Sequence, residues 1–179
     1  MKQKVRVAIS LGSNLGDRLE FLTLAARRLA GEFLERAQAS RVYETEPWRG
    51  MDHPLYLNAL IVGESEWKPP AILNYLQEVE RDLGRTPGER YAPRVVDLDL
   101  IAYGEQSWES PGVCVPHPFM HERDFVLVPM LELWPDWRHP KLGKTVKQLW
   151  AELLETSPQK NAAAGPRVFA PPLLDTTNL

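Results

Sequence analysis

The sequence predicts an α+β fold whose core follows the order βαββαβ. Two observations lead to this prediction. Short segments with alternating apolar residues, typical of strands, are separated by longer segments with apolar residues at helical spacing. Glycine and proline stand where these segments meet. At 179 residues, the chain has the length of one domain that can bury a substantial core.

The first half of the core contains three strands and one helix. Apolar residues alternate over residues 5–9, and this strand ends at SLGSNLGDR, a loop with two glycines. A helical pattern begins at Asp17, which suits a helix N-cap. The next predicted strands cover residues 38–45 and 56–62, and we expect them to pair.

The second half supplies a helix and the last core strand. The helix begins near Pro69, since proline is tolerated in a first turn, and ends near Gly84. The fourth strand covers residues 95–103, and helices are predicted over 123–133 and 145–154. This order is the split βαβ arrangement of ferredoxin-like folds. We therefore expect an antiparallel sheet with both core helices on one face and the other face free for a site.

The end of the chain differs in composition from the rest. Residues 157–179 (SPQKNAAAGPRVFAPPLLDTTNL) are rich in proline and alanine and predict an extended C-terminal tail. We expect residues 1–156 to form a single domain.

Composition and charge exclude several classes of protein. A net charge of -3 argues against a nucleic-acid binder that relies on phosphate neutralisation. The single cysteine, Cys114, excludes an internal disulfide and fits a reducing cytoplasm. The chain starts directly in a strand pattern, without a signal-peptide core, and no apolar run approaches the roughly 20 residues that cross a membrane.

The fourth strand carries two carboxylates, Asp97 and Asp99, in an otherwise apolar run. Alternate residues of a strand share a face, about 7 Å apart. A divalent cation such as Mg²⁺ would offset the cost of burying two like charges, and Arg85, Arg90 and Arg94 could hold phosphates beside it. Alternatively, both carboxylates face solvent in ordinary ion pairs. On this segment alone, the two interpretations are equally good.

The loop GSNLGDR does not match a phosphate-binding pattern. It lacks the GxxxxGK[ST] spacing and the lysine of a P-loop, and it does not match GxGxxG. We interpret it as a tight turn in which Gly12 and Gly16 relieve backbone strain.

The segment YETEPW…YLNA has groups that suit a flat heterocyclic ring. Thr45, Asn58 and the backbone near Pro47 offer donors and acceptors, and Tyr56 or Trp48 could border the ring. Alternatively, Asn58 is structural and bonds a neighbouring loop. Without other information, the structural interpretation is favoured.

The segment PHPFMHERDF contains further candidate ligands. His117 and His121 stand four residues apart, as zinc ligands on a helix can, but Pro118 lies between them and no third ligand is evident. We interpret His117 as a loop residue that could donate to a phosphate. Arg123 could hold an anion, and Phe125 could stack on a ring or simply belong to the core.

Six segments in the same order resemble one family. SLGSNLGDR, YETEP, YLNA, VERDLGR, APRVVDLDLIAYG and VPHPFMHERDFVLVPMLEL are similar to 6-hydroxymethyl-7,8-dihydropterin pyrophosphokinases of folate biosynthesis. The similarity extends over about residues 5–140. It implies a ferredoxin-like fold and transfer of pyrophosphate from ATP to the pterin hydroxymethyl group, with release of AMP.

The resemblance also implies roles for individual residues. Asp97 and Asp99 would bind two Mg²⁺ ions, and Arg85 and Arg94 would be catalytic. Four residues would contact ATP: Gln77, Leu100, His117 and Arg123. Five would line the pterin pocket: Thr45, Pro47, Tyr56, Asn58 and Phe125. The implied partners are these small molecules, and we expect a cytoplasmic monomer.

The chain departs from the family pattern in two loops. Thr86-Pro87 stands where a second arginine or lysine is frequent, and Arg90 could supply that charge. Tyr91 replaces a common tryptophan, and Arg49 follows Trp48 where glycine is usual. Two alternatives therefore stay open: a ferredoxin-like binding module and a catalytically inactive paralogue.

Overall fold

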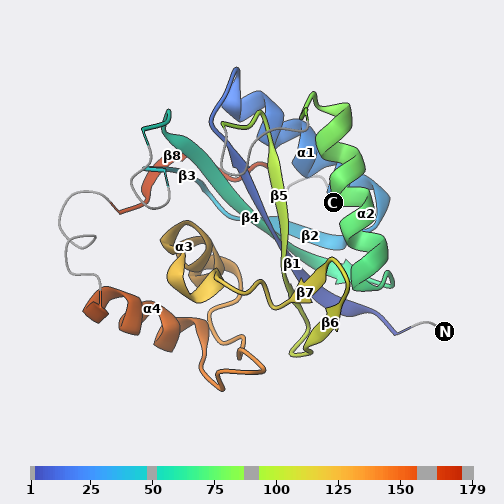
Figure 1. The fold of residues 1–179 in the computed structure, drawn as a ribbon, viewed down its shortest axis with the longest axis vertical. Coiled ribbons are helices and arrows are strands. Elements are labelled where there is room, and N and C mark those ends of the chain that lie inside the picture. The colour runs from blue at the N-terminus through green and yellow to red at the C-terminus, as the bar shows by residue number, and fades with distance from the viewer. Residues whose placement is uncertain (1–2, 48–51, 87–92, 157–164, 175–179) are drawn as a thin grey trace.

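The computed structural model describes residues 3–47, 52–86, 93–156 and 165–174, and it has the predicted βαββαβ core (Figure 1). The main sheet has the strand order β5-β1-β4-β3-β8, with β2 also paired to β4. The inferences about Trp48, Arg49, Arg90 and Tyr91 lie outside the described residues.

The central strand is β1 (Val5–Ser13), which pairs antiparallel with β4 (Tyr56–Ser65) and β5 (Asp97–Tyr103). The turn after β1 leads into α1 (Arg18–Glu32). The Asp17 side chain accepts a hydrogen bond from the Glu20 backbone N–H at 3.0 Å, which confirms the predicted N-cap. Gly16 has a φ of +66°, a value that favours glycine, as the turn interpretation requires.

The strand predicted over residues 38–45 is two strands, β2 (Glu35–Ala39) and β3 (Val42–Thr45), and both pair with β4. They part at Ser40 and Arg41. The Ser40 hydroxyl accepts the Leu60 backbone N–H, and the Arg41 backbone N–H donates to the Glu132 carboxylate. Side chains thus replace ladder partners at this point.

The first face of the sheet is covered as predicted. Helices α1 and α2 (Pro69–Asp82) pack on this face (Figure 1). Their apolar residues, such as Leu22 and Ile72, join Val7, Ile9 and Leu11 in one core. This arrangement confirms the ferredoxin-like fold class.

The second face was expected to be free, and this is only partly correct. Helices α3 (Asp124–Leu133) and α4 (Val146–Thr156) cover one half of it. Because side chains alternate along a strand, the covered half presents Ala8, Leu60 and Ile101 to these helices. The same face of the same strands continues into Ser10 and Asn58, and this half forms a pocket.

A β-hairpin and a short helix join β5 to α3. The hairpin consists of β6 (Trp108–Ser110) and β7 (Val113–Val115), and a 3₁₀ turn, η2 (Met120–Glu122), follows. The described part of the expected tail contains β8 (Arg167–Ala170), which pairs with β3. The tail is thus extended here, but it is a strand of the main sheet. None of the helices within the described ranges is long and apolar enough to cross a membrane.

Candidate active site

The open half of the second sheet face is a pocket with a volume of about 270 Å³. Strands β1, β3, β4 and β5 supply its floor, and the segment from His117 to Phe125 supplies one wall. Nine of its lining residues were candidates from the sequence: Thr45, Tyr56, Asn58, Arg94, Asp97, Asp99, His117, Arg123 and Phe125. Segments far apart in the chain thus meet at one place.

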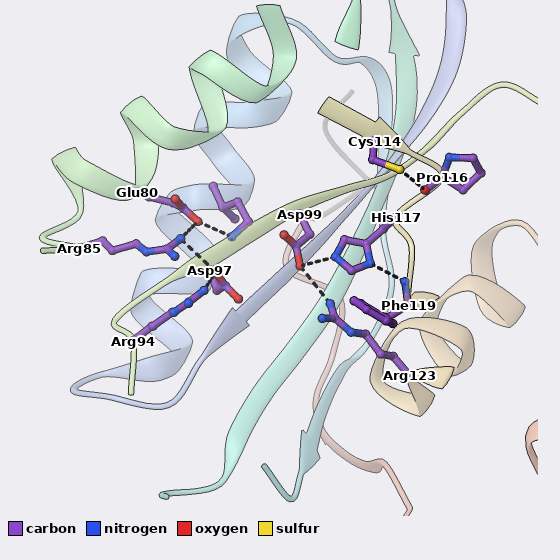
Figure 2. Close-up of polar contacts among 11 residues, drawn as sticks. Glu80, Arg85, Arg94, Asp97, Asp99, Cys114, Pro116, His117, Phe119 and Arg123 are labelled. Atoms are coloured by element: carbon purple, nitrogen blue, oxygen red, sulfur yellow. Dashed lines mark hydrogen bonds and ion pairs between the residues drawn. The ribbon is translucent and has the colours of Figure 1, made fainter. Parts of the chain in front are cut away.

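Asp97 and Asp99 lie on the same face of β5, and each is ion-paired with a different set of cations (Figure 2). Asp97 Oδ1 lies 2.5 Å from Arg94 Nη1 and 3.0 Å from Arg85 Nη1. Asp99 Oδ2 lies 3.2 Å from Arg123 Nη1. The two sequence interpretations therefore both describe part of the site: the carboxylates line a pocket, and they are held in ion pairs.

The electrostatics of Asp99 are consistent with a site for additional positive charge. Burial, and then the charge of Asp97, raise the pKa of Asp99 to about 6, although Arg123 and Arg94 lower it. About 37% of its side chain remains exposed through the pocket. Burial and the Asp97 charge together therefore outweigh the effect of the arginines on the pKa of Asp99.

A divalent cation fits this donor set. Mg²⁺ commonly takes one or two carboxylates and completes its coordination with water and substrate phosphates. Among the described residues, no group of three or more His, Cys, Asp or Glu side chains could hold a metal. The zinc interpretation of His117 and His121 thus has no third ligand, whereas Asp97 and Asp99 need only substrate oxygens beside them.

Glu80 of α2 holds Arg85, and sequence reasoning missed it. Glu80 is 6% exposed, and its Oε1 accepts the Leu98 backbone N–H of β5 at 2.7 Å and a short bond from Arg85 Nη1. Burial raises the pKa of Glu80. The sequence could have indicated its importance, because Glu80 follows Val79 on the apolar face of a helix, where a charge needs a partner.

His117 is neutral and has a defined tautomer. Its Nδ1 accepts the Phe119 backbone N–H at 3.2 Å, so the proton is on Nε2, which lies 3.9 Å from Asp99 Oδ2 (Figure 2). Burial, and then the Arg123 charge, lower the pKa of His117 to about 4. His117 can therefore donate one hydrogen bond into the pocket without carrying a charge.

The other side of the pocket combines amide, hydroxyl and aromatic groups. Asn58 Nδ2 donates to Thr45 Oγ1 at 2.7 Å, so Asn58 does make a structural bond, but to the neighbouring strand β3 and not to a loop, and both residues also line the pocket. A Cβ on Gly12 would stand only 3.2 Å from Asn58 Oδ1. The Arg123 guanidinium lies 5.5 Å from the centre of the Phe125 ring. Phe125 lines the pocket and also packs on the α3 core.

Four candidates do not line the pocket. Arg85 reaches it only through its ion pair with Asp97. Gln77 is exposed on α2, and the Leu100 side chain is 2% exposed in the core under α1 and α2. Pro47 is buried beside the pocket residue Glu46.

Sequence reasoning also missed Asn14, which ties two loops to the site. Its backbone N–H donates to the Arg94 carbonyl at 3.0 Å, and its Oδ1 accepts the Arg94 backbone N–H at 2.7 Å. Its Nδ2 donates to the Pro54 carbonyl at 3.3 Å. The pocket also contains Ser10, Gly12, Glu46 and Phe119, for which the sequence predicted no role in a site; Gly12 was expected only as a turn residue.

The fold and the pocket together define a class of protein. An antiparallel βαββαβ domain holds paired carboxylates and arginines on one side of a pocket and amide, hydroxyl and aromatic groups on the other. Charge neutralisation and positioning are what phosphoryl-type transfer requires. The class is therefore that of enzymes which transfer a phosphate-containing group to a small ring compound.

Comparisons with known proteins identify the family. A family model described as 7,8-dihydro-6-hydroxymethylpterin-pyrophosphokinase (HPPK) matches residues 8–135, and the chain belongs to this family. The family consists of transferases of folate synthesis that move pyrophosphate from ATP to the pterin hydroxymethyl group. The fold and the function expected from the sequence are thus confirmed.

Curated relatives include two bacterial enzymes named 2-amino-4-hydroxy-6-hydroxymethyldihydropteridine pyrophosphokinase. The chain is 42% identical to that of Porphyromonas gingivalis over 140 residues, which is 75% of this chain and 94% of the relative. It is 34% identical to that of Aquifex aeolicus over 146 residues, 82% and 91% of the two chains. A folic acid synthesis protein of Pneumocystis carinii is 34% identical, and the chain covers 20% of its length.

Solved structures show the same fold. A wild-type HPPK-DHPS of Plasmodium falciparum matches with a TM-score of 0.70 at 11% identity, over 89% of this chain and 46% of that one. An HPPK-DHPS in complex with substrates matches with a TM-score of 0.71 at 12% identity, over 90% and 46%. The chain thus spans less than half of these two-part proteins.

Proposed function

We propose that the pocket over β1, β4 and β5 carries out the pyrophosphoryl transfer of this family in this chain. The position of Asp97 and Asp99 supports the proposal most directly. Both carboxylates face one pocket, between three arginines and next to ring-binding groups. Nucleotide phosphates and the accepting hydroxyl would meet at these carboxylates.

Asp97 and Asp99 would hold two Mg²⁺ ions together with the phosphates of ATP. The ions would supply positive charge that neutralises the phosphates and would favour deprotonation of the attacking hydroxyl. The raised pKa of Asp99 is consistent with this role, since a bound cation would offset the burial and the Asp97 charge that raise it. With such charges present, the reaction needs no strong protein base.

The arginines and His117 would bind and orient the phosphates. Arg94 and Arg123 line the pocket, and the neutral His117 offers its Nε2–H there. Arg85 would leave its ion pair with Asp97 when a phosphate takes its place, while Glu80 keeps it near the site. Gln77 and Leu100 would contact the adenine. Leu100 would do so through its backbone, because its side chain is buried in the core.

The pterin would bind where β3 and β4 adjoin α3. Asn58 and Thr45 present paired polar groups to a planar, amide-like ring, and an analogue without matching groups would leave them unpaired. Phe125 would stack on the ring, Tyr56 would border it, and Pro47 would support the strand end. We also propose that the protein acts as a monomer in the cytoplasm, which its single free cysteine suits.

The experiment measures AMP release from ATP with Mg²⁺ and 6-hydroxymethyl-7,8-dihydropterin. We expect pterin-dependent AMP from the wild type and a loss of at least about 100-fold in Asp97→Ala. Asp136→Ala is the matched control, because Asp136 forms an exposed ion pair with Lys147. Absence of pterin-dependent AMP in the wild type would reject the proposed activity, and equal turnover in Asp97→Ala would reject the metal assignment.

A further inference from the structure

The C-terminal strand β8 lies beside β3 (Figure 1), and the last residue of β3, Thr45, lines the pocket. It falls outside residues 8–135, which the family model matches. β8 pairs with one edge of β3, and the other edge of β3 pairs with β4, with Thr45 opposite Tyr56. β3 thus stands between the C-terminal strand and β4, whose Tyr56 and Asn58 line the pocket together with Thr45 of β3.

Arg18, the first residue of α1, connects three of these segments. Its Nη1 donates to the Leu55 carbonyl at 2.8 Å, and its Nη2 lies 3.1 Å from the Glu44 carboxylate of β3. Its guanidinium stands 5.7 Å from the ring centre of Phe169 in β8. One side chain therefore touches the loop before β4, strand β3 and the C-terminal strand.

The two residues that Arg18 holds, Leu55 by its backbone carbonyl and Glu44 by its carboxylate, adjoin pocket residues. Leu55 immediately precedes Tyr56, and Glu44 immediately precedes Thr45. A free arginine side chain samples many rotamers, and a ring packed on the guanidinium reduces that freedom. Phe169 thus favours the one orientation in which Arg18 reaches both residues.

We propose that Arg18, oriented by Phe169, is a positioning residue for the pterin half of the pocket. The C-terminal strand thereby becomes part of what determines pterin affinity. This inference rests on the proposed function, since it takes Thr45 and Tyr56 as pterin-binding residues. The phosphate half, on β5 and the segment from His117 to Arg123, has no contact with Arg18 among those described.

The test is a comparison of KM values for pterin and for ATP in the full chain. Phe169→Ala should raise the pterin KM about threefold and leave kcat and the ATP KM unchanged. Arg18→Lys, which loses the planar donors, should raise it about tenfold. Phe169→Trp keeps a ring and should behave as the wild type. Val168→Ala is the control, because Val168 directly precedes Phe169 in the same strand and is 55% exposed.

A double variant separates this role from a general loss of stability. Phe169→Ala should add nothing in the Arg18→Lys background, because Phe169 acts only through Arg18. Additive effects, an unchanged pterin KM in Arg18→Lys, or an equal rise in the ATP KM would overturn the inference. Failure of the proposed function looks different, since the wild type itself would then release no pterin-dependent AMP.

Discussion

Single residues at the centre of the site form a network of ion pairs between carboxylates and arginines. Arg94 and Arg85 share Asp97, and Arg123 holds Asp99. The same cations that pair with the carboxylates in the free protein are those that ATP phosphates would attract. Under the proposed function, ligand binding would exchange one set of ion pairs for another.

Arg94 allows a test of that exchange. We expect Arg94→Ala to reduce kcat about 100-fold and to change ATP affinity only about threefold or less, because its charge matters most in the transition state. Asn14 holds the Arg94 backbone through two bonds, so removal of the side chain leaves the segment in place. Steady-state kinetics and nucleotide titration measure both quantities. Equal losses in rate and affinity would contradict the expectation.

Asp99 and His117 give opposite pH dependences of stability in the free protein. The pKa of Asp99 is raised from 3.8 to about 6, so its contribution to the free energy of unfolding falls as pH rises through that window. The pKa of His117 is lowered from 6.5 to about 4, so its contribution falls as pH drops through that window. The two contributions largely cancel between pH 4 and 6.5.

Removal of either group should therefore reveal the pH dependence of stability that the other group contributes. Between pH 4.5 and 6.5, Asp99→Asn should become more stable as pH rises, and His117→Gln should become less stable. A shift of two pKa units corresponds to about 3 kcal/mol, an upper limit that the exposure of Asp99 reduces. Urea unfolding without Mg²⁺ or nucleotide measures this, and parallel pH profiles for both variants would contradict it.

At the scale of elements, β1 brings both Ser10 and a glycine, Gly12, to the pocket. Gly12 lies opposite Asn58 of β4, and a Cβ there would meet Asn58 Oδ1 at 3.2 Å. The close approach of these two strands lets Asn58 keep its bond to Thr45 while it lines the pocket. Gly12 therefore matters for packing, since its φ is not in the left-handed region.

Gly12→Ala should lower pterin affinity about tenfold and reduce stability by about 1 kcal/mol, because Asn58 must shift by a few tenths of an ångström. Gly31→Ala is the control, since nothing lies within 4 Å of a Cβ at Gly31 in α1. That change should raise stability by about 0.5–1 kcal/mol and leave binding unchanged. Calorimetry with the pterin measures both, and wild-type affinity in Gly12→Ala would reject the packing argument.

Helices and strands with strong periodicity can be predicted from the sequence. Breaks in a strand where side chains from distant segments take the backbone hydrogen bonds cannot. The run from Asp97 to Tyr103 and the cap at Asp17 follow from local pattern, and both are confirmed. The break between β2 and β3 depends on Ser40 and on Glu132, which is far away in sequence, so no local pattern could show it. The pairing of β8 is equally non-local.

The same limit applies to the site. Asp97, Asp99 and Asn58 stand out because polar groups in apolar strands need partners. Asn14 and Glu80 act by bonding backbone groups of distant segments, Arg94 and Leu98, and their importance is visible only when those segments meet.

At the scale of the whole molecule, one sheet separates two apolar cores, and only one of them adjoins the pocket. Leu22 of α1 belongs to the first core and Leu127 of α3 to the second, and both are fully buried. The second core packs against α3, the helix that contains Phe125 and begins directly after Arg123. The two cores should therefore contribute similarly to stability and differently to binding.

Leu22→Ala and Leu127→Ala form a matched pair for this expectation. Each should reduce the free energy of unfolding by about 3 kcal/mol, as buried leucines do when a cavity remains. Only Leu127→Ala should also weaken pterin and ATP binding severalfold, because α3 then loses packing beneath Phe125 and Arg123. Urea unfolding measures the first effect, and ligand titration under conditions where both variants are folded measures the second. Equal binding by the two variants would show that the α3 core supports the fold alone, and that the β-strands hold the pocket without it.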